Sequence, residues 1–347
     1  MATLLTNIPS VMWSGNVPDL ELTANDHVNI AVDVDGTVIL RVTIFTLNGM
    51  AKLVELAEIV EQDMVGRGAF KSEVTIYDVD DDDPTDMTQL CQFDVIYCSY
   101  SMSNDVKDFC RQNFLTTAHA KQLERDTLEQ LFFFDPDNGS ETLRMQVGYM
   151  DDGILRIATV DDASSLIDTD CVKFDVATVA ELADVADVAD VRTVTFTLGK
   201  RQIFYYINEI PADAVFSFAN CFNLMEMLPL NCVTERKQVG DRSVAQVRRR
   251  AVIAHMEHEV EYEVNTAPLS TDEVSLVEQM CESPKVLLQP GNDEIVISSR
   301  TCEFSDERGE LPSAKFTWKY RDGRKHANVP HVEDDGIFSD EFDPNYD

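Results

Sequence analysis

The stretch Asn29-Ile-Ala-Val-Asp-Val-Asp-Gly-Thr-Val-Ile39 alternates apolar and polar side chains around the dipeptide Asp35-Gly36. A period of two is typical of β-strands that bury one face. An Asp-Gly pair accepts the positive φ angles that both central residues of a type I′ turn require. The stretch therefore predicts a β-hairpin between strands over 27–34 and 37–45.

The same pattern recurs along the chain. Strand-like segments 143–149 and 154–160 flank Asp151-Asp-Gly153, and a strand over 316–320 leads into Asp322-Gly323 and a further short strand after Arg324. Strands spaced about 8 to 15 residues apart with such turns are typical of β-sandwiches and barrels. We therefore predict a mainly β protein with two to three β-sandwich or barrel-like domains in tandem and a few short helices.

Three segments have helical periodicity. Residues 51–65 predict a helix that Gly66 closes, and residues 121–133 predict another. Ser270 and Glu273 form a capping box pattern ahead of apolar residues at helical spacing, which predicts a helix over 271–282.

Composition suggests where domains begin and end. We expect an N-terminal β domain over 1–112 with an acidic loop at 78–86, and a middle β domain over 113–212 with a low-complexity insert at 181–191. A C-terminal β domain over 213–335 would contain the helix near 271–282, followed by an acidic tail over 336–347.

The chain is strongly acidic, with a formal net charge of −35 over 347 residues. Such a field repels phosphate backbones and anionic lipid heads, so we expect no direct nucleic-acid or membrane partner. No apolar run reaches the length of a membrane span, and no basic residue precedes an apolar segment at the N-terminus as in a secretory signal. The eight scattered cysteines match no zinc pattern, and we expect reduced thiols.

The opening motif has a second interpretation. Asp33-x-Asp35-Gly-Thr also matches the first motif of the haloacid-dehalogenase phosphatases, in which the first Asp is the nucleophile and the second is the general acid. In that family the nucleophile lies at the carboxyl end of a parallel strand, and a loop and helix follow. Here alternation continues through residues 38–45, so we favour the hairpin. We expect no enzyme, no catalytic residue and no cofactor.

Two patterns resemble metal sites. Asp78, Asp80 and Asp82 could hold Ca²⁺ weakly, but an EF-hand loop would need Gly and Glu where Asp83 and Gln89 stand. His255 and His258 are three apart, so on a strand they would point to opposite faces. We expect a solvated acidic loop and no metal site.

Arg248, Arg249 and Arg250 form a basic cluster in this acidic chain, with Arg236, Lys237 and Arg242 nearby. Interleaved aromatic residues, which a nucleic-acid surface usually has, are missing here. We interpret the cluster as a docking surface for an acidic neighbour, which could be another copy of the same chain.

Residues 214–230 contain Phe218, Asn220 and Phe222-Asn223, and residues 262–273 lead through a helix to Ser283-Pro-Lys-Val. This order resembles a loose family of virion proteins from tailed phages and prophages of gut Bacteroidales, clearly over residues 195–330. The resemblance implies a β-rich, non-enzymatic component of a phage tail, baseplate or tail-proximal assembly, made in the host cytoplasm and built from copies of itself with neighbouring phage proteins.

An alternative is a carbohydrate-binding or host-adhesion β-sandwich, because such modules bind glycans on exposed aromatic side chains. The tyrosines available for that role are Tyr97, Tyr100, Tyr205 and Tyr206, although tyrosines on strands more often serve packing. A glycan therefore remains a possible partner.

Overall fold

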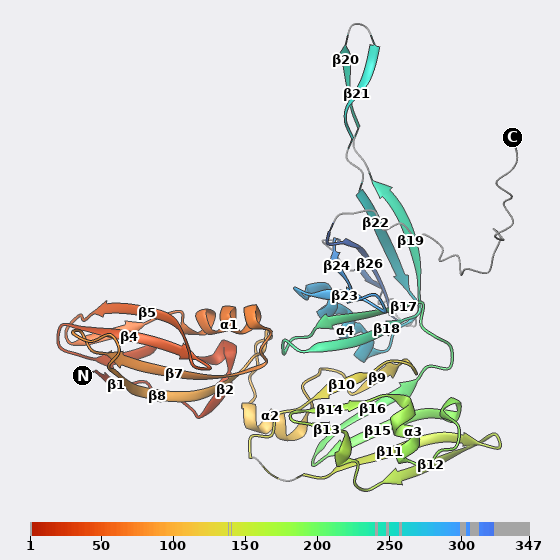
Figure 1. Cartoon of the computed structure of the whole chain (residues 1–347), viewed down its shortest axis with the longest axis horizontal. Helices are drawn as coiled ribbons and strands as arrows, with labels where there is room; N and C mark the ends of the chain where they lie inside the picture. Colours follow the sequence, from red (N-terminus) through yellow and green to blue (C-terminus); the bar gives the residue numbers. More distant parts are fainter. Residues whose placement is uncertain are drawn as a thin grey trace, which may run out of the picture.

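The computed structural model describes residues 2–137, 139, 141–239, 242–247, 250–256, 259–298, 303–305 and 312–322. The protein is mainly β, with several sheets and four short α-helices in these ranges, as the sequence predicts (Figure 1). No helix in this part of the chain is long and apolar enough to span a bilayer.

The N-terminal part packs a five-stranded sheet against a three-stranded one. The large sheet has the order β2-β8-β7-β4-β5 and the small sheet the order β1-β3-β6. The strands are β1 Thr3–Leu4, β2 Val11–Trp13, β3 Leu20–Thr23, β4 His27–Val34, β5 Thr37–Phe45, β6 Met50–Leu53, β7 Lys71–Val79 and β8 Met87–Ile96. Helix α1, Leu56–Arg67, contributes Leu56, Val60 and Met64 to the shared core.

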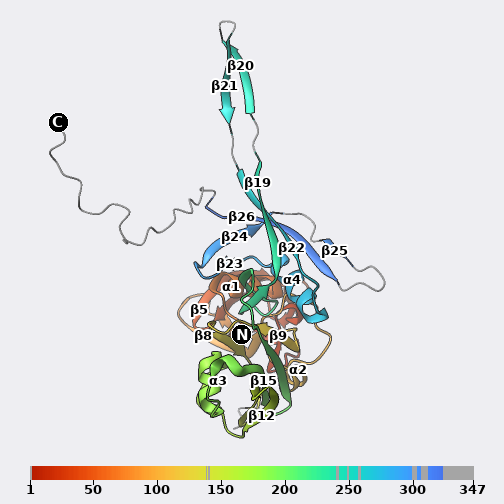
Figure 2. The same cartoon turned by 90° about the vertical axis from the view of Figure 1, so that its right-hand side faces the viewer.

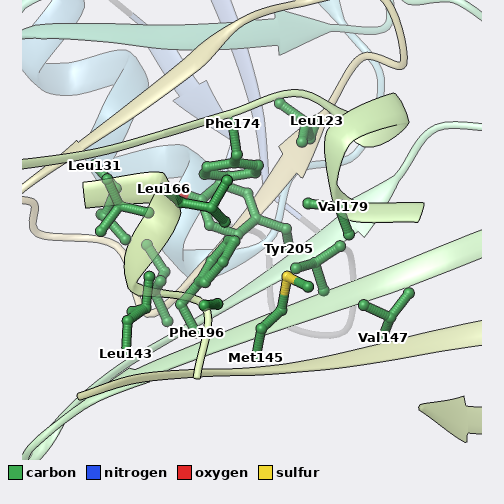
Figure 3. Packing of buried hydrophobic residues seen from close by; sticks show 14 of the residues in the cluster. Leu123, Leu131, Leu143, Met145, Val147, Leu166, Phe174, Val179, Phe196 and Tyr205 are labelled. Atoms are coloured by element: carbon green, nitrogen blue, oxygen red, sulfur yellow. The ribbon is translucent and has the colours of Figure 1, made fainter. Parts of the chain in front are cut away.

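The middle part repeats this arrangement. Its large sheet has the order β12-β11-β15-β16-β9 and its small sheet the order β10-β14-β13. The elements are β9 Ala120–Leu123, β10 Glu129–Phe132, β11 Leu143–Asp151, β12 Ile154–Val160, β13 Ile167–Asp168, β14 Cys171–Phe174, α3 Val176–Leu182, β15 Val191–Leu198 and β16 Arg201–Ile207. Figure 3 shows Phe174, Phe196 and Tyr205 at the centre of the core between the two sheets.

The two parts share one topology. In each, the first strand of the large sheet, β2 or β9, lies at the edge and pairs parallel to the last, β8 or β16. In each, an Asp-Gly turn joins the hairpin at the opposite edge, and a helix leads into the last two strands. The large sheets of the two parts therefore follow the same chain path, although their sequences differ.

The C-terminal part forms the largest sheet, with the order β18-β17-β23-β24-β26-β22-β19 and β25 paired to β26. Its elements are β17 Ala214–Ala219, β18 Met225–Leu230, β19 Cys232–Val239, β22 Glu259–Thr266, α4 Thr271–Glu282, β23 Val286–Leu288, β24 Asp293–Ile297, β25 Glu303–Ser305 and β26 Ser313–Tyr320. Helix α4 packs Leu276, Val277 and Met280 into the core of this sheet.

The helix predictions have mixed outcomes. Helix α4 matches the predicted range 271–282, and Ser270 and Glu273 form both hydrogen bonds of the capping box. The helix predicted over 51–65 instead begins at Leu56, because Met50–Leu53 pairs with β3, and it closes at Gly68. The helix predicted over 121–133 is wrong, since this segment forms β9 and β10.

Two regions differ from the sequence interpretation in detail. The segment 181–191, predicted as a low-complexity insert, forms the end of α3, a turn and a single 3-10 turn at Val188–Asp190. Val185 from this segment is buried in the core of the middle part. The strand predicted after Arg324 and the tail over 336–347 lie outside the described residues.

A fourth apolar cluster joins the three parts of the chain. Trp13 packs edge-on against Phe109 of helix α2, Val106–Gln112, with ring centroids 5.4 Å apart. Phe222, from the C-terminal part, lies 5.7 Å from the same Phe109 ring. The middle part contributes Phe132 of β10, whose ring lies 6.2 Å from that of Phe70. Aromatic side chains from all three parts thus meet at this junction, and their burial holds the parts together.

Candidate functional site

The Asp35-Gly36 turn is a hairpin turn, as the alternation predicts. Strands β4 and β5 pair antiparallel on either side of it, and Asp35 and Gly36 have φ angles of 51° and 82°. The Asp33 carboxylate accepts a hydrogen bond from the Gly36 amide at 2.8 Å. Asp33 thus caps a turn between antiparallel strands, whereas a dehalogenase nucleophile follows a parallel strand.

Asp35 also has a structural partner. Its carboxylate accepts hydrogen bonds from the Glu73 amide and from Arg67, each at 2.8 Å. Partial burial opposes ionisation of this carboxyl, but the Glu73 amide and the Arg67 guanidinium outweigh that effect and lower its pKa. Asp35 therefore stays ionised and joins the hairpin turn to α1 and β7.

The Asp-rich loop 80–86 folds over the outward face of the N-terminal sheet. Asp81 accepts hydrogen bonds from His27, at 2.8 Å, and from Asn29. Asp80 accepts hydrogen bonds from the amides of Asp82 and Asp83, at 2.8 and 3.2 Å. The Asp78 carboxylate accepts a bond from the Ala2 amide at 2.7 Å.

The three weak calcium candidates are Asp78, Asp80 and Asp82. The carboxylates of Asp78 and Asp80 accept hydrogen bonds from backbone amides. A polar cleft of about 460 Å³ lies beside the loop, lined among others by Asp78, Asp80 and Asp81. Across the part of the chain that the structure describes, no three His, Cys, Asp or Glu side chains converge as metal ligands would.

The most unusual polar group is a buried charge cluster between the middle and C-terminal parts. Lys121 on β9 is only 3% exposed, and its Nζ lies 2.5 Å from Glu129 Oε1 and 3.2 Å from Glu226 Oε1. Glu129 comes from β10, and Glu226 comes from β18 in the C-terminal sheet. One ammonium group thus bridges carboxylates from two separately folded sheets.

Neighbouring groups satisfy the remaining acceptors of Glu226. Thr116 donates to Glu226 Oε1 at 2.6 Å, and Asn220 donates to Glu226 Oε2 at 2.8 Å and to the Leu115 carbonyl at 3.0 Å. The cluster is therefore hydrogen-bonded throughout, which buried charges require.

Burial and mutual attraction set the protonation of this cluster. Burial opposes the charge on Lys121, but Glu129 and Glu226 outweigh it and raise the Lys121 pKa. Burial raises the pKa of Glu129, against the opposing attraction of Lys121. Burial also raises the pKa of Tyr205, whose hydroxyl lies 3.5 Å from Glu129 Oε1. A cavity of about 550 Å³ lies beside the cluster, lined by Lys121 together with Gln122, Tyr206 and the start of α4. The ion pairs of the cluster join the middle part to the C-terminal sheet.

Arg201 performs a similar role between α2 and the middle sheet. This arginine is 1% exposed, and it donates to the carbonyls of Cys110, at 2.6 Å, and Phe134, at 3.0 Å, while it pairs with Glu141. The side chain thereby satisfies carbonyls at the end of α2 and in the segment after β10.

The second prominent feature is a projecting arm, residues 232–266. Strands β19 and β22 form its stem, and β20, Arg242–Val247, pairs with β21, Arg250–Met256, as a separate two-stranded ribbon. Figures 1 and 2 show this ribbon extending well away from the three sheets. An isolated two-stranded ribbon is at best marginally stable in water, so a second surface would stabilise it.

The arm contains the predicted basic cluster. Between residues 236 and 250 the sequence has six Lys and Arg residues against one Asp, in a chain of net charge −35. Arg248 and Arg249 lie outside the described residues, and Arg250 is placed by its backbone as the first residue of β21. His255 lies on β21, and His258 lies outside the described residues.

The four tyrosines proposed as a glycan platform do not form one surface. Tyr205 is fully buried, and Tyr97 is partly buried against the N-terminal core. Tyr100 and Tyr206 are exposed, and Tyr206 packs against Phe204 with ring centroids 4.5 Å apart. Six cysteines of the described ranges form no disulfide, namely Cys91, Cys98, Cys110, Cys171, Cys221 and Cys232.

Comparisons with known proteins place the chain in no family. No family model matches it, and no curated protein does. Among solved structures, the full extracellular region of plexin A4 matches at 8% identity with a TM-score of 0.23. The match covers 94% of this chain and 40% of that one, and at this TM-score it supports no conclusion about fold or function.

Sequence reasoning missed the Lys121 cluster and the strand order that the N-terminal and middle sheets share. Lys121, Glu129 and Glu226 lie far apart in the chain, and their residue types are ordinary on a protein surface. One signal was present in the segment 121–133, where Gln122 and Gln130 alternate with Leu123 and Leu131 at the period of a strand.

Proposed function

We propose that the protein is a non-enzymatic structural protein that assembles from several copies of itself, as a building block of a phage tail, baseplate or tail-proximal assembly. The projecting arm is the observation that carries this proposal. Its outer ribbon, β20 and β21, pairs with no other strand of the described chain. A copy or neighbouring phage protein that receives the arm would stabilise it.

The charge distribution of the chain supports another copy of the same chain as the partner that binds the arm. The segment 236–250 is basic, while the rest of the chain is strongly acidic. The outer ribbon of the arm, residues 242–256, has four Arg and no Asp or Glu. The ribbon of one copy and the acidic body of the next therefore attract each other, and such attraction orients partners and speeds their encounter. The body is well suited to carry an arm, because the aromatic junction and the Lys121 cluster hold its parts together.

The resemblance of residues 195–330 to virion proteins of Bacteroidales phages directs the proposal to a virion rather than to another assembly. Under this proposal the protein is made in the host cytoplasm and assembled there. No nucleic acid or membrane takes part, since the acidic field disfavours both.

An arm-trimmed variant tests the proposal. Replacing residues 239–259 by Asn-Gly joins Gln238 to Val260, which are paired across the stem, through a two-residue hairpin turn. We expect the variant to keep the thermal stability of the body and to lose assembly, as measured by analytical ultracentrifugation and electron microscopy. A trimmed variant that assembles like the wild type would contradict the role of the arm.

The exposed Tyr206, which packs against the half-buried Phe204, favours a second candidate function, adhesion to a host glycan. A glycan array probed with wild type and Tyr206→Ala distinguishes the two functions. Binding that depends on Tyr206 would support adhesion, while the absence of glycan binding would leave assembly as the one candidate function.

A further inference from the structure

We propose that the outward face of the middle five-stranded sheet is a contact surface for a second copy of this chain. This inference rests on the proposed function and names the surface that the assembly would use. The inward face of the sheet packs on the Phe174 core, through residues such as Met145 and Val147 of β11. Strand register places the outward face on the alternate residues, which are Arg144, Gln146, Gly148 and Met150 of β11, Leu155, Ile157 and Thr159 of β12, Thr193, Thr195 and Thr197 of β15, Gln202, Phe204 and Tyr206 of β16, and Ala120 and Gln122 of β9.

Large apolar side chains project from this face into solvent. Leu155 is 58% exposed, Ile157 is 70% exposed and Tyr206 is 54% exposed. Strand β12 is also the last strand of its sheet, so it presents a free edge among the described strands. Exposed apolar residues grouped on one sheet face indicate an interaction site, whereas single ones scattered over a surface do not.

The face also lacks the charge of the rest of the chain. Among the strand residues just listed, Arg144 is the one Lys or Arg and none is Asp or Glu, although the chain has 63 of these acidic residues. Asp272 and Glu273 at the start of α4 border the face beside β9. A surface without carboxylates is where two copies of a strongly acidic chain can meet without like-charge repulsion.

The N-terminal sheet gives an internal comparison, because it has the same topology. Its outward face carries Asp33, Arg41, Glu73 and Asp94, and the Asp-rich loop lies over it through Asp81. In the middle sheet the connection at the place of that loop is the short turn at Gly199 and Lys200. The outward face of the N-terminal sheet is thus charged and partly covered by a loop, whereas that of the middle sheet has no such loop and no Asp or Glu on its strands.

The occupant that fits is the same face of a second copy, related by a two-fold axis. Such a contact is self-complementary, so one patch supplies both sides. Five strands about 4.8 Å apart and about 25 Å long give a face on the order of 600 Å². This area is close to the roughly 800 Å² that each partner buries in a stable protein interface.

The test uses the full-length protein with Ile157→Asp, and Phe45→Asp as the matched control. Phe45 is 78% exposed at the outer edge of the charged N-terminal face, so the control replaces an exposed apolar side chain by Asp on the corresponding edge strand of the other large sheet. Sedimentation velocity over a concentration series gives the dissociation constant, and circular dichroism verifies that both variants keep the wild-type melting temperature. We expect Ile157→Asp to weaken self-association at least tenfold and Phe45→Asp to leave it unchanged.

Amide hydrogen exchange of the wild type locates the contact independently. We expect amides of β12 and β16 to become more protected as the protein concentration rises. Assembly that survives Ile157→Asp, or that Phe45→Asp weakens equally, would overturn this surface and leave the proposed function standing. A wild type that stays monomeric throughout would overturn both.

Discussion

Replacing Lys121 by Met should destabilise the protein strongly. The methionine side chain fills nearly the same space, so the change removes the charge without opening a large cavity. It leaves Glu129 and Glu226 buried against each other without the ammonium group that lies 2.5 and 3.2 Å from them. Removing one partner of a buried ion pair costs about 3–5 kcal/mol. For a cooperative unit of about 150–250 residues this lowers the melting temperature by roughly 6–20 °C.

The loss should depend on pH in a defined direction. Burial already raises the Glu129 pKa above its ordinary value of 4.5, and the attraction of Lys121 limits that rise. Without Lys121 the folded protein favours the protonated carboxyl still more. Stability of the variant therefore falls as pH rises above 4.5, so its deficit relative to the wild type is larger at pH 8 than at pH 5.

Urea unfolding at pH 5 and pH 8 measures this effect. The matched control is Lys173→Met, because Lys173 forms an exposed pair with Asp168 in the same part of the chain and its loss should leave the unfolding midpoint unchanged. A Lys121→Met deficit below about 1 kcal/mol that is equal at the two pH values would refute the reasoning.

Three further predictions concern local features. Gly36→Ala should cost about 1 kcal/mol, because a side chain there meets no atom within 4 Å and only the φ of 82° is strained; urea unfolding measures it. Ser270→Ala should cost about 1 kcal/mol in the same assay by removing the cap that bonds the Glu273 amide, and Ser270→Asp should recover most of it. Burial raises the pKa of the Cys110 thiol to about 12 and that of Cys171 to about 11, so iodoacetamide at pH 8 should label both only after unfolding, as mass spectrometry would detect.

Local turn chemistry made much of the β structure predictable. The pairs Asp35-Gly36 and Asp152-Gly153 adopt positive φ at both positions, and the flanking strands have the predicted bounds within a few residues. The helix at 271–282 was equally predictable, because the capping box is a local sequence pattern. Where neighbouring residues determine the structure, the prediction was correct.

Long-range pairing explains what could not be predicted. Strand β9 pairs parallel to β16, so the segment that contains Lys121 is ordered by residues near 205 and not by its own helical periodicity. The Lys121 cluster depends on that placement and on Glu226 from a third sheet. The topology that the N-terminal and middle sheets share is likewise a property of strand order. It depends on pairing between strands that lie far apart in the sequence.

The most direct test of self-assembly is the mass of the purified wild type in solution, from light scattering over a wide concentration range with electron microscopy of the same sample. A defined multimer or closed ring of several copies is the predicted result. A strict monomer at every concentration would contradict the account, because the Arg-rich ribbon of the arm and the outward face of the middle sheet would then lack the partner that their chemistry fits.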